Sequence, residues 1–79
     1  MVIVVYVTVR NREDAVRLSE IFVDFGIEAD IGRPRISVDV RDVCGIEQLG
    51  LPRELPLFIH GDICNALKKE LLYFNYREL

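Results

Sequence analysis

Cysteine and histidine are scarce in this chain of 79 residues, which contains two cysteines and one histidine. Cys44 and Cys64 lie in different segments, so they have neither the density of a disulfide scaffold nor the spacing of a zinc ligand set. His60 has no second ligand nearby in the sequence, and no serine or cysteine is spaced as a nucleophile. We therefore expect no metal site and no cofactor, and a turn after His60 explains this residue better than a proton-transferring pair with Asp62.

A strong charge of either sign is also missing, because ten basic and thirteen acidic residues give a net charge of −3. No long-range field attracts a polyanion, so a nucleic-acid partner is not expected. The apolar first segment, Val2–Val9, is too short to span a membrane and lacks the features of a signal peptide. These absences favour a soluble cytoplasmic protein without a membrane partner.

The chain is near the lower length limit of domains that fold alone. No repeat, low-complexity tract or linker divides it, so we expect a single domain over residues 1–79. Apolar residues make up 51% of the chain. That share is high for this length. It indicates either a dense core or an apolar surface that meets a partner, and a second copy of the chain in a homodimer is one such partner.

The first strand and the first helix have the clearest sequence pattern. Val2–Val9 is β-branched and apolar almost without alternation, which is typical of a central strand covered on both faces. Asn11 is placed to cap a helix in which apolar residues recur every three or four positions up to Phe25. Gly26 is placed to end that helix in the left-handed conformation.

The remaining elements are shorter. In chain order they are a strand at Ile27–Ile31, an alternating strand at Ile36–Val40, a helical turn at Gly45–Leu49, a strand at Leu57–His60 and a last helix from Asp62 or Asn65. Gly32–Arg35 is either a bend in one long strand or the turn of a hairpin. The order β-α-β, a connector and β-(β)-α favours an α/β fold, with a mixed sheet and helices packed on it.

Two stretches of the chain match the pattern of a known family. Val4-Val5-Tyr6, Val16-Arg17-Leu18 and Phe25-Gly26-Ile27-Glu28 are similar to that family's first strand and helix, and the stretch from Leu55 to Asp62 is similar to a strand that opens on a cis-proline and ends on a Gly-acid turn. The chain thus resembles the glutaredoxins and their thioredoxin-like relatives. The resemblance implies a small thioredoxin-like sandwich in which Pro56 is cis.

A ferredoxin-like α+β fold is the runner-up. Such a fold needs a strand after its last helix, and only Tyr76–Leu79 remain there, which are too few residues for the strand we would expect.

The family's catalytic chemistry is absent from its usual place. Arg12-Glu13-Asp14-Ala15 stand where the resemblance puts a Cys-x-x-Cys, so the thiolate nucleophile is missing. We therefore interpret the chain as a member that lacks this motif: a non-catalytic interaction or regulatory module rather than an enzyme. The resemblance implies a binding groove between the loop of Arg10, Asn11 and Arg12 and the pair Leu55 and Pro56.

Two other functions stay open at this stage. Cys44 and Cys64 make an atypical thiol redox protein if they meet in space, and they are small buried residues or a structural disulfide otherwise. The apolar surplus alternatively suits a small structural homo-oligomer. Arg10 and Arg12 are either solvated surface charges or an anion site at a helix N-terminus. In each case the expected partner is another protein or a second copy of this chain.

Overall fold

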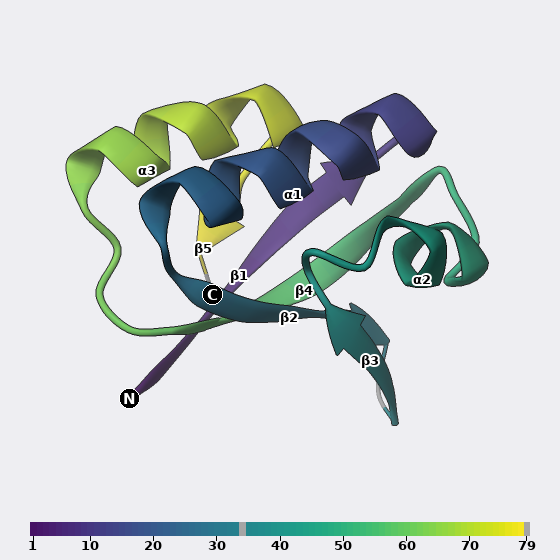
Figure 1. Cartoon of the computed structure of the whole chain (residues 1–79), viewed down its shortest axis with the longest axis horizontal. Helices are drawn as coiled ribbons and strands as arrows, with labels where there is room; N and C mark the ends of the chain where they lie inside the picture. Colours follow the sequence, from purple (N-terminus) through teal and green to yellow (C-terminus); the bar gives the residue numbers. More distant parts are fainter. Residues whose placement is uncertain (34, 79) are drawn as a thin grey trace.

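The computed structural model describes residues 1–33 and 35–78. In chain order its elements are β1 (Val2–Val9), α1 (Arg12–Phe25), β2 (Glu28–Arg33), β3 (Ile36–Asp39), α2 (Val43–Gln48), β4 (Arg53–His60), α3 (Asn65–Leu71), the 3-10 turn η1 (Leu72–Phe74) and β5 (Arg77–Glu78) (Figure 1). The α/β class predicted from the sequence is confirmed.

The five described strands form one sheet in the order β3-β2-β4-β1-β5. All pairings between these strands are antiparallel. The prediction of a mixed sheet is therefore wrong, because β4 lies between β1 and β2 and runs antiparallel to both. A parallel β1–β2 pair does not form, although α1 connects these two strands as a crossover.

A last strand follows the final helix, contrary to the expectation that the chain is too short for one. Arg77 and Glu78 form β5 and pair with Tyr6 and Val5 of β1. Two residues suffice because β5 only extends the edge of a sheet that β1 and β4 already hold together over eight residue pairs. The chain thus has the strand after the last helix that a ferredoxin-like fold needs.

The prediction of a cis-proline at Pro56 is also wrong. The cis peptide bond lies between Leu51 and Pro52, just before β4, whereas the bond between Leu55 and Pro56 is not cis. Pro56 instead lies within β4, opposite Tyr6 of β1, and continues the extended backbone of that strand.

β2 and β3 form a hairpin, so the turn interpretation of this segment is right and the bend interpretation is wrong. The pairing runs from Asp30 opposite Asp39 to Arg33 opposite Ile36. The backbones come so close that a Cβ on Gly32 would lie 2.2 Å from the carbonyl oxygen of Ile36. Pro34, which the sequence places in the turn, lies outside the described residues.

Helix α1 begins and ends where the sequence predicts. The Asn11 side chain accepts a hydrogen bond from the backbone N–H of Asp14 at 2.9 Å. Gly26 has a φ of 64°, and the N–H groups of Gly26 and Ile27 bond back to the last turn of the helix. Local capping interactions therefore fix both ends of the helix.

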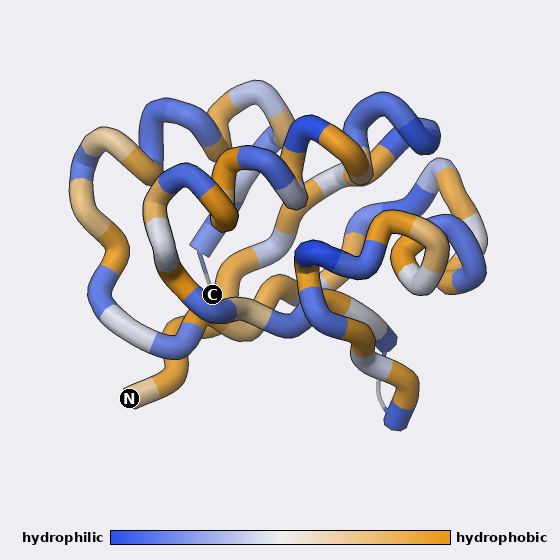
Figure 2. Tube along the Cα trace, viewed as in Figure 1, coloured by the Kyte–Doolittle hydropathy of each residue, from blue (hydrophilic) through white to orange (hydrophobic). Residues whose placement is uncertain are grey.

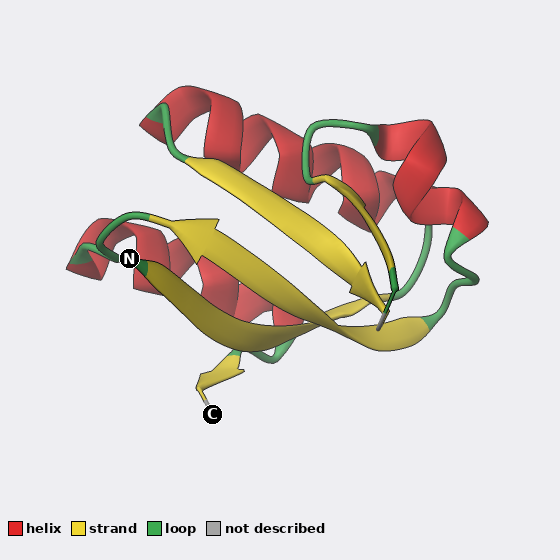
Figure 3. Ribbon diagram, turned by 90° about the horizontal axis from the view of Figure 1, so that it is seen from below, coloured by secondary structure: helices red, strands yellow, loops and turns green. Residues whose placement is uncertain are grey.

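The helices cover only one face of the sheet. Figure 1 places α1 and α3 side by side above the strands, and Figure 3 shows the sheet from below with the helices behind it. The expectation that Val2–Val9 is covered on both faces is therefore wrong, since only Val5, Val7 and Val9 of this strand are buried. The sequence does not show this alternation of buried and exposed residues, because most residues of β1 are β-branched and apolar on both faces. Figure 2 accordingly shows β1 as mostly hydrophobic.

One cluster of apolar side chains fills the space between the sheet and the helices. Its largest members, all fully buried or nearly so, are Phe22, Phe74, Leu18, Ile31, Ile46, Leu55, Leu57, Ile59, Leu67 and Leu71. The helix-facing side chains of β4 are thus committed to the core, and the alternate residues of the same strand face away from it.

Candidate binding surface

The loop of Arg10, Asn11 and Arg12 leads from β1 into α1, and its polar groups bond to neighbouring residues. The Nε of Arg10 donates to the carboxylate of Asp14 at 2.7 Å, and the Arg10 backbone N–H donates to the same oxygen at 3.0 Å. Arg12 forms an ion pair with Glu47 of α2. These contacts fix the start of α1 and attach α2 to it.

The carboxylate of Asp14 lies in the first turn of α1, beside this loop, and is buried, since the residue is only 3% exposed. Burial acts to raise the pKa of Asp14, but the hydrogen bonds and the charge of Arg10 outweigh burial, and the net result is a lowered pKa. Arg10 therefore serves to keep this carboxylate ionised inside the fold.

Leu55 and Pro56, which the resemblance places in the same groove as this loop, face opposite sides of the sheet. Leu55 is fully buried in the core, opposite Val7. Pro56 lies opposite Tyr6 on the other face. The two residues therefore do not line one surface together.

The two cysteines do not meet. Cys44 lies in α2 and Cys64 directly precedes α3, and both are free and exposed. Figure 1 places α2 and the start of α3 at opposite ends of the molecule. The interpretations as buried residues and as a structural disulfide are therefore wrong. The redox interpretation required the two cysteines to meet, and they lie apart.

The uncovered side of the sheet, which we call the open face, carries the residues that alternate with the core. Val4 lies opposite Phe58, and Tyr6 lies opposite Pro56. Directly opposed residues of an antiparallel pair project to the same side. All four side chains are partly exposed. They form an apolar strip along the two central strands, and we use that name for Val4, Tyr6, Pro56 and Phe58.

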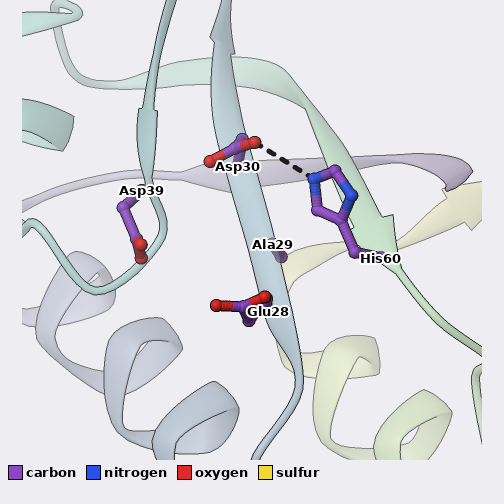
Figure 4. A pocket seen from close by; sticks show the side chains of 5 residues that line it. All are labelled: Glu28, Ala29, Asp30, Asp39 and His60. Atoms are coloured by element: carbon purple, nitrogen blue, oxygen red, sulfur yellow. Dashed lines mark hydrogen bonds and ion pairs between the residues drawn. The ribbon is translucent and has the colours of Figure 1, made fainter.

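A shallow hollow lies beside the apolar strip, over β2, the end of β4 and the end of β3. Its volume is about 270 Å³, and it is lined by Glu28, Ala29, Asp30, Asp39 and His60 (Figure 4). We call it the acidic hollow. The Nε2 of His60 lies 3.1 Å from the carboxylate of Asp30. The partner of this histidine is thus Asp30, thirty residues away in sequence, rather than Asp62.

Some of the carboxylates on the open face are bound to arginines. Arg77 makes two hydrogen bonds to Glu54, at 2.8 and 2.9 Å, and its guanidinium lies over the ring of Tyr6, 4.4 Å from the centroid. These bonds lower the pKa of Glu54. Hydrogen bonds from Arg41 lower the pKa of Asp39 to about 2.

Glu28 and Asp30 remain as the carboxylates of the acidic hollow for which the described residues show no arginine or lysine ion pair. The acidic hollow thus has more carboxylates than arginines, since only Asp39 among its three acidic residues is paired with an arginine. Asp30 also lies directly opposite Asp39, an arrangement of like charges that weakens a strand pair.

The two C-terminal tyrosines have different surroundings. Tyr73 is 44% exposed, and the guanidinium groups of Arg10 and Arg17 lie 4.7 and 4.0 Å from its ring centroid. Tyr76 packs against the core. Neither tyrosine lies on the open face.

Tyr6 and Phe58 are surface residues that the sequence pattern does not reveal. Apolar and polar residues hardly alternate in Val2–Val9, and the β4 segment has apolar residues on both sides of the strand as well. A sequence signal did exist for the acidic hollow, since Glu28 and Asp30 are two residues apart and therefore share one face of a strand.

Comparison of the chain with protein-family models, with curated proteins and with solved structures finds no match. Within residues 1–33 and 35–78, no group of three or more metal-ligating side chains could hold a metal ion. The described part of the chain also contains no helix that is long and apolar enough to cross a membrane.

Proposed function

We propose that this protein is a non-catalytic interaction module that binds a segment of another protein on the open face of its sheet. The observation that carries the proposal is the apolar strip, which lies over the two central strands without a covering helix. In a sheet with one solvated face, the outward residues are normally polar. Here the central cross-strand pairs are Val4–Phe58 and Tyr6–Pro56. Aromatic residues in such a position are typical of the energetic centre of an interface.

The fold that we propose for this module is a ferredoxin-like one with an insertion, in place of the thioredoxin-like one. β1, α1, β2, β4, α3 and β5 supply the order β-α-β-β-α-β, and β3 with α2 form an insertion after β2. Without β3, the strand order becomes β2-β4-β1-β5, in which the first and third strands of the unit lie at the centre. Both central strands supply residues to the apolar strip.

The open face is small, which suits a short peptide segment as the partner. The principal-axis extents of the molecule are 28 × 24 × 20 Å, and Figure 3 looks onto the open face.

The exposed free cysteines support a reducing compartment as the place where this module acts. Free surface thiols persist where the cell keeps thiols reduced, as in the cytosol. Cys44 and Cys64 are both exposed and unpaired. We therefore include a cytoplasmic location in the proposal.

A random peptide library tests the function. Short peptides are selected against the wild-type protein, and the affinity of each enriched peptide is then measured for Phe58→Ser and for Val4→Thr, which keeps the shape of the side chain. We expect about a tenfold loss of affinity in Phe58→Ser, as for an aromatic side chain at the centre of an interface, and a smaller loss in Val4→Thr.

Val23→Thr is the matched control, because Val23 lies on α1 and is 57% exposed. Its peptide affinities should equal those of the wild type. Far-UV circular dichroism confirms that each variant is folded. Peptides that bind Phe58→Ser as tightly as the wild type would refute the proposal, and so would a library that yields no enriched peptide.

A further inference from the structure

We infer that the partner segment is basic and apolar: it places a lysine or arginine side chain in the acidic hollow while its apolar side chains cover the apolar strip. This inference rests on the proposed function, and it assigns the chemistry of the occupant. Charge complementarity across the open face supports this occupant, and so does the distance between the acidic hollow and the apolar strip.

The charge of the open face excludes two other occupants. A second copy placed face to face would bring Glu28 and Asp30 of both chains into one interface. Neither carboxylate makes an arginine or lysine ion pair within the described residues, so the like charges of the two chains would oppose association. A single-stranded nucleic acid could stack a base on Phe58, but Arg77 already lies over the ring of Tyr6, and the phosphates would meet the same carboxylates. A cationic peptide gains from both parts of the surface.

The acidic hollow and the apolar strip are in register for one extended peptide. Asp39, Asp30, Phe58 and Val4 form a single row across four strands. Neighbouring strands lie about 4.8 Å apart, so this row is roughly 14 Å long. Alternate residues of an extended peptide are about 6.8 Å apart. A peptide that follows the row therefore places a basic residue over Asp30 and Asp39 and apolar residues two and four positions away over Phe58 and Val4.

A cation in the acidic hollow also removes an electrostatic cost of the free protein. Asp30 and Asp39 are directly opposed on adjacent strands, and like charges so placed destabilise the pair. Arg41 binds Asp39, whereas the group that contacts the Asp30 carboxylate is the imidazole of His60 and not an arginine or lysine. A lysine ammonium or arginine guanidinium of the partner supplies the basic counter-charge for Glu28 and Asp30.

The composition of the peptides selected by the library provides the first test. Among peptides whose binding depends on Phe58, we expect lysine and arginine to exceed aspartate and glutamate, with a basic residue two or four positions from an aromatic or aliphatic one. Phe58-dependent peptides that are neutral or acidic overturn this inference and leave the proposed function standing. A library without Phe58-dependent peptides removes the proposed function itself.

Charge-neutralising variants provide the second test, with one enriched basic peptide as the probe. Glu28→Gln combined with Asp30→Asn should weaken binding about fivefold, as expected for the loss of two exposed ion pairs. The matched control combines Glu13→Gln and Glu20→Gln, two exposed positions on α1, and should leave the affinity within twofold of the wild type. Equal losses in both double variants would show a nonspecific effect of net charge and overturn the inference.

Two measurements decide against the alternative occupants. Light scattering at micromolar concentration should show a monomer, and a dimer that Phe58→Ser dissociates would make a second copy the occupant. Fluorescence anisotropy with a labelled oligouridine should show no binding, and Phe58-dependent binding of this probe would make a nucleic acid the occupant. Either result overturns the inference.

Discussion

Helices cover only one face of the sheet. Truncating the smaller of two neighbouring β4 residues should therefore destabilise the protein more than truncating the larger one. Leu57 is fully buried between sheet and helices, opposite Val5 and Ile31. Phe58 is larger, but its side chain lies on the open face and is partly exposed. Leu57→Ala should therefore cost more stability than Phe58→Ala, although it removes fewer atoms.

The expected magnitudes follow from the surroundings of each side chain. Leu57→Ala removes a side chain enclosed by the core and leaves a cavity, which costs about 3 kcal/mol. Phe58→Ala leaves no enclosed cavity because water replaces the ring, and only the partial burial is lost, about 1.5 kcal/mol. If helices covered both faces, the larger aromatic residue would give the larger loss, since buried Phe→Ala costs about 3–5 kcal/mol.

Urea unfolding followed by circular dichroism measures both losses. A slope of about 1 kcal/mol per molar urea for so small a protein converts them to midpoint shifts of about 3 M and about 1.5 M. Because a domain of this size has a net stability of only about 3–5 kcal/mol, Ile59→Val serves as a milder core substitution, with an expected cost of about 1 kcal/mol. Phe58→Ala that costs as much as Leu57→Ala would refute the one-sided arrangement and the binding surface with it.

Three further predictions concern the hairpin, the buried carboxylate and the thiols. Gly32→Ala should destabilise the protein by about 2 kcal/mol in the same urea assay, because its Cβ would overlap the backbone of the opposite strand; an unchanged midpoint would contradict that close approach. The pKa of Asp14 is lowered in the folded state by Arg10, so its contribution to stability is complete above the unfolded value of about 4 and is lost as the pH falls through the lower folded value. Thermal unfolding between pH 6 and pH 2 should therefore show a smaller acid loss for Asp14→Asn than for the wild type, and parallel curves would refute this assignment. Iodoacetamide should modify both Cys44 and Cys64 in the native protein without prior reduction, since both are free and exposed; mass spectrometry that finds either thiol protected would contradict their positions.

The elements whose signals are local could be predicted from the sequence. Asn11 and Gly26 define the ends of α1 through hydrogen bonds to residues within one helical turn, so a short stretch of sequence contains all the information. The short helix after β3 is also predicted, and the side chain of Asp42 caps it by accepting from the N–H of Gly45. The final helix is predicted too, although no side chain caps its first turn. The resemblance to glutaredoxins rested on the same local order of strand, helix and proline-containing strand, and it did not include which strands pair.

Strand pairing was decided by the tertiary structure. The sequence alone allowed β1 and β2 to be parallel neighbours, and only the insertion of β4 between them excludes this. That insertion lets Leu55, Leu57 and Ile59 of β4 complete the core on the helix side. It depends on contacts between residues about fifty positions apart, for which a single sequence gives no signal.

The open face is likewise a product of the tertiary structure. A strand such as Val2–Val9, apolar at nearly every position, shows no sign of which side is left without helices. The acidic hollow joins Asp30 to His60 and to Asp39 from three different strands. The sequence by itself thus determined the helices and the apolar character of the strands, because these depend on near neighbours. The tertiary structure alone decided which apolar residues stay at the surface and which charges stand beside them, because both depend on the order of strands in the sheet.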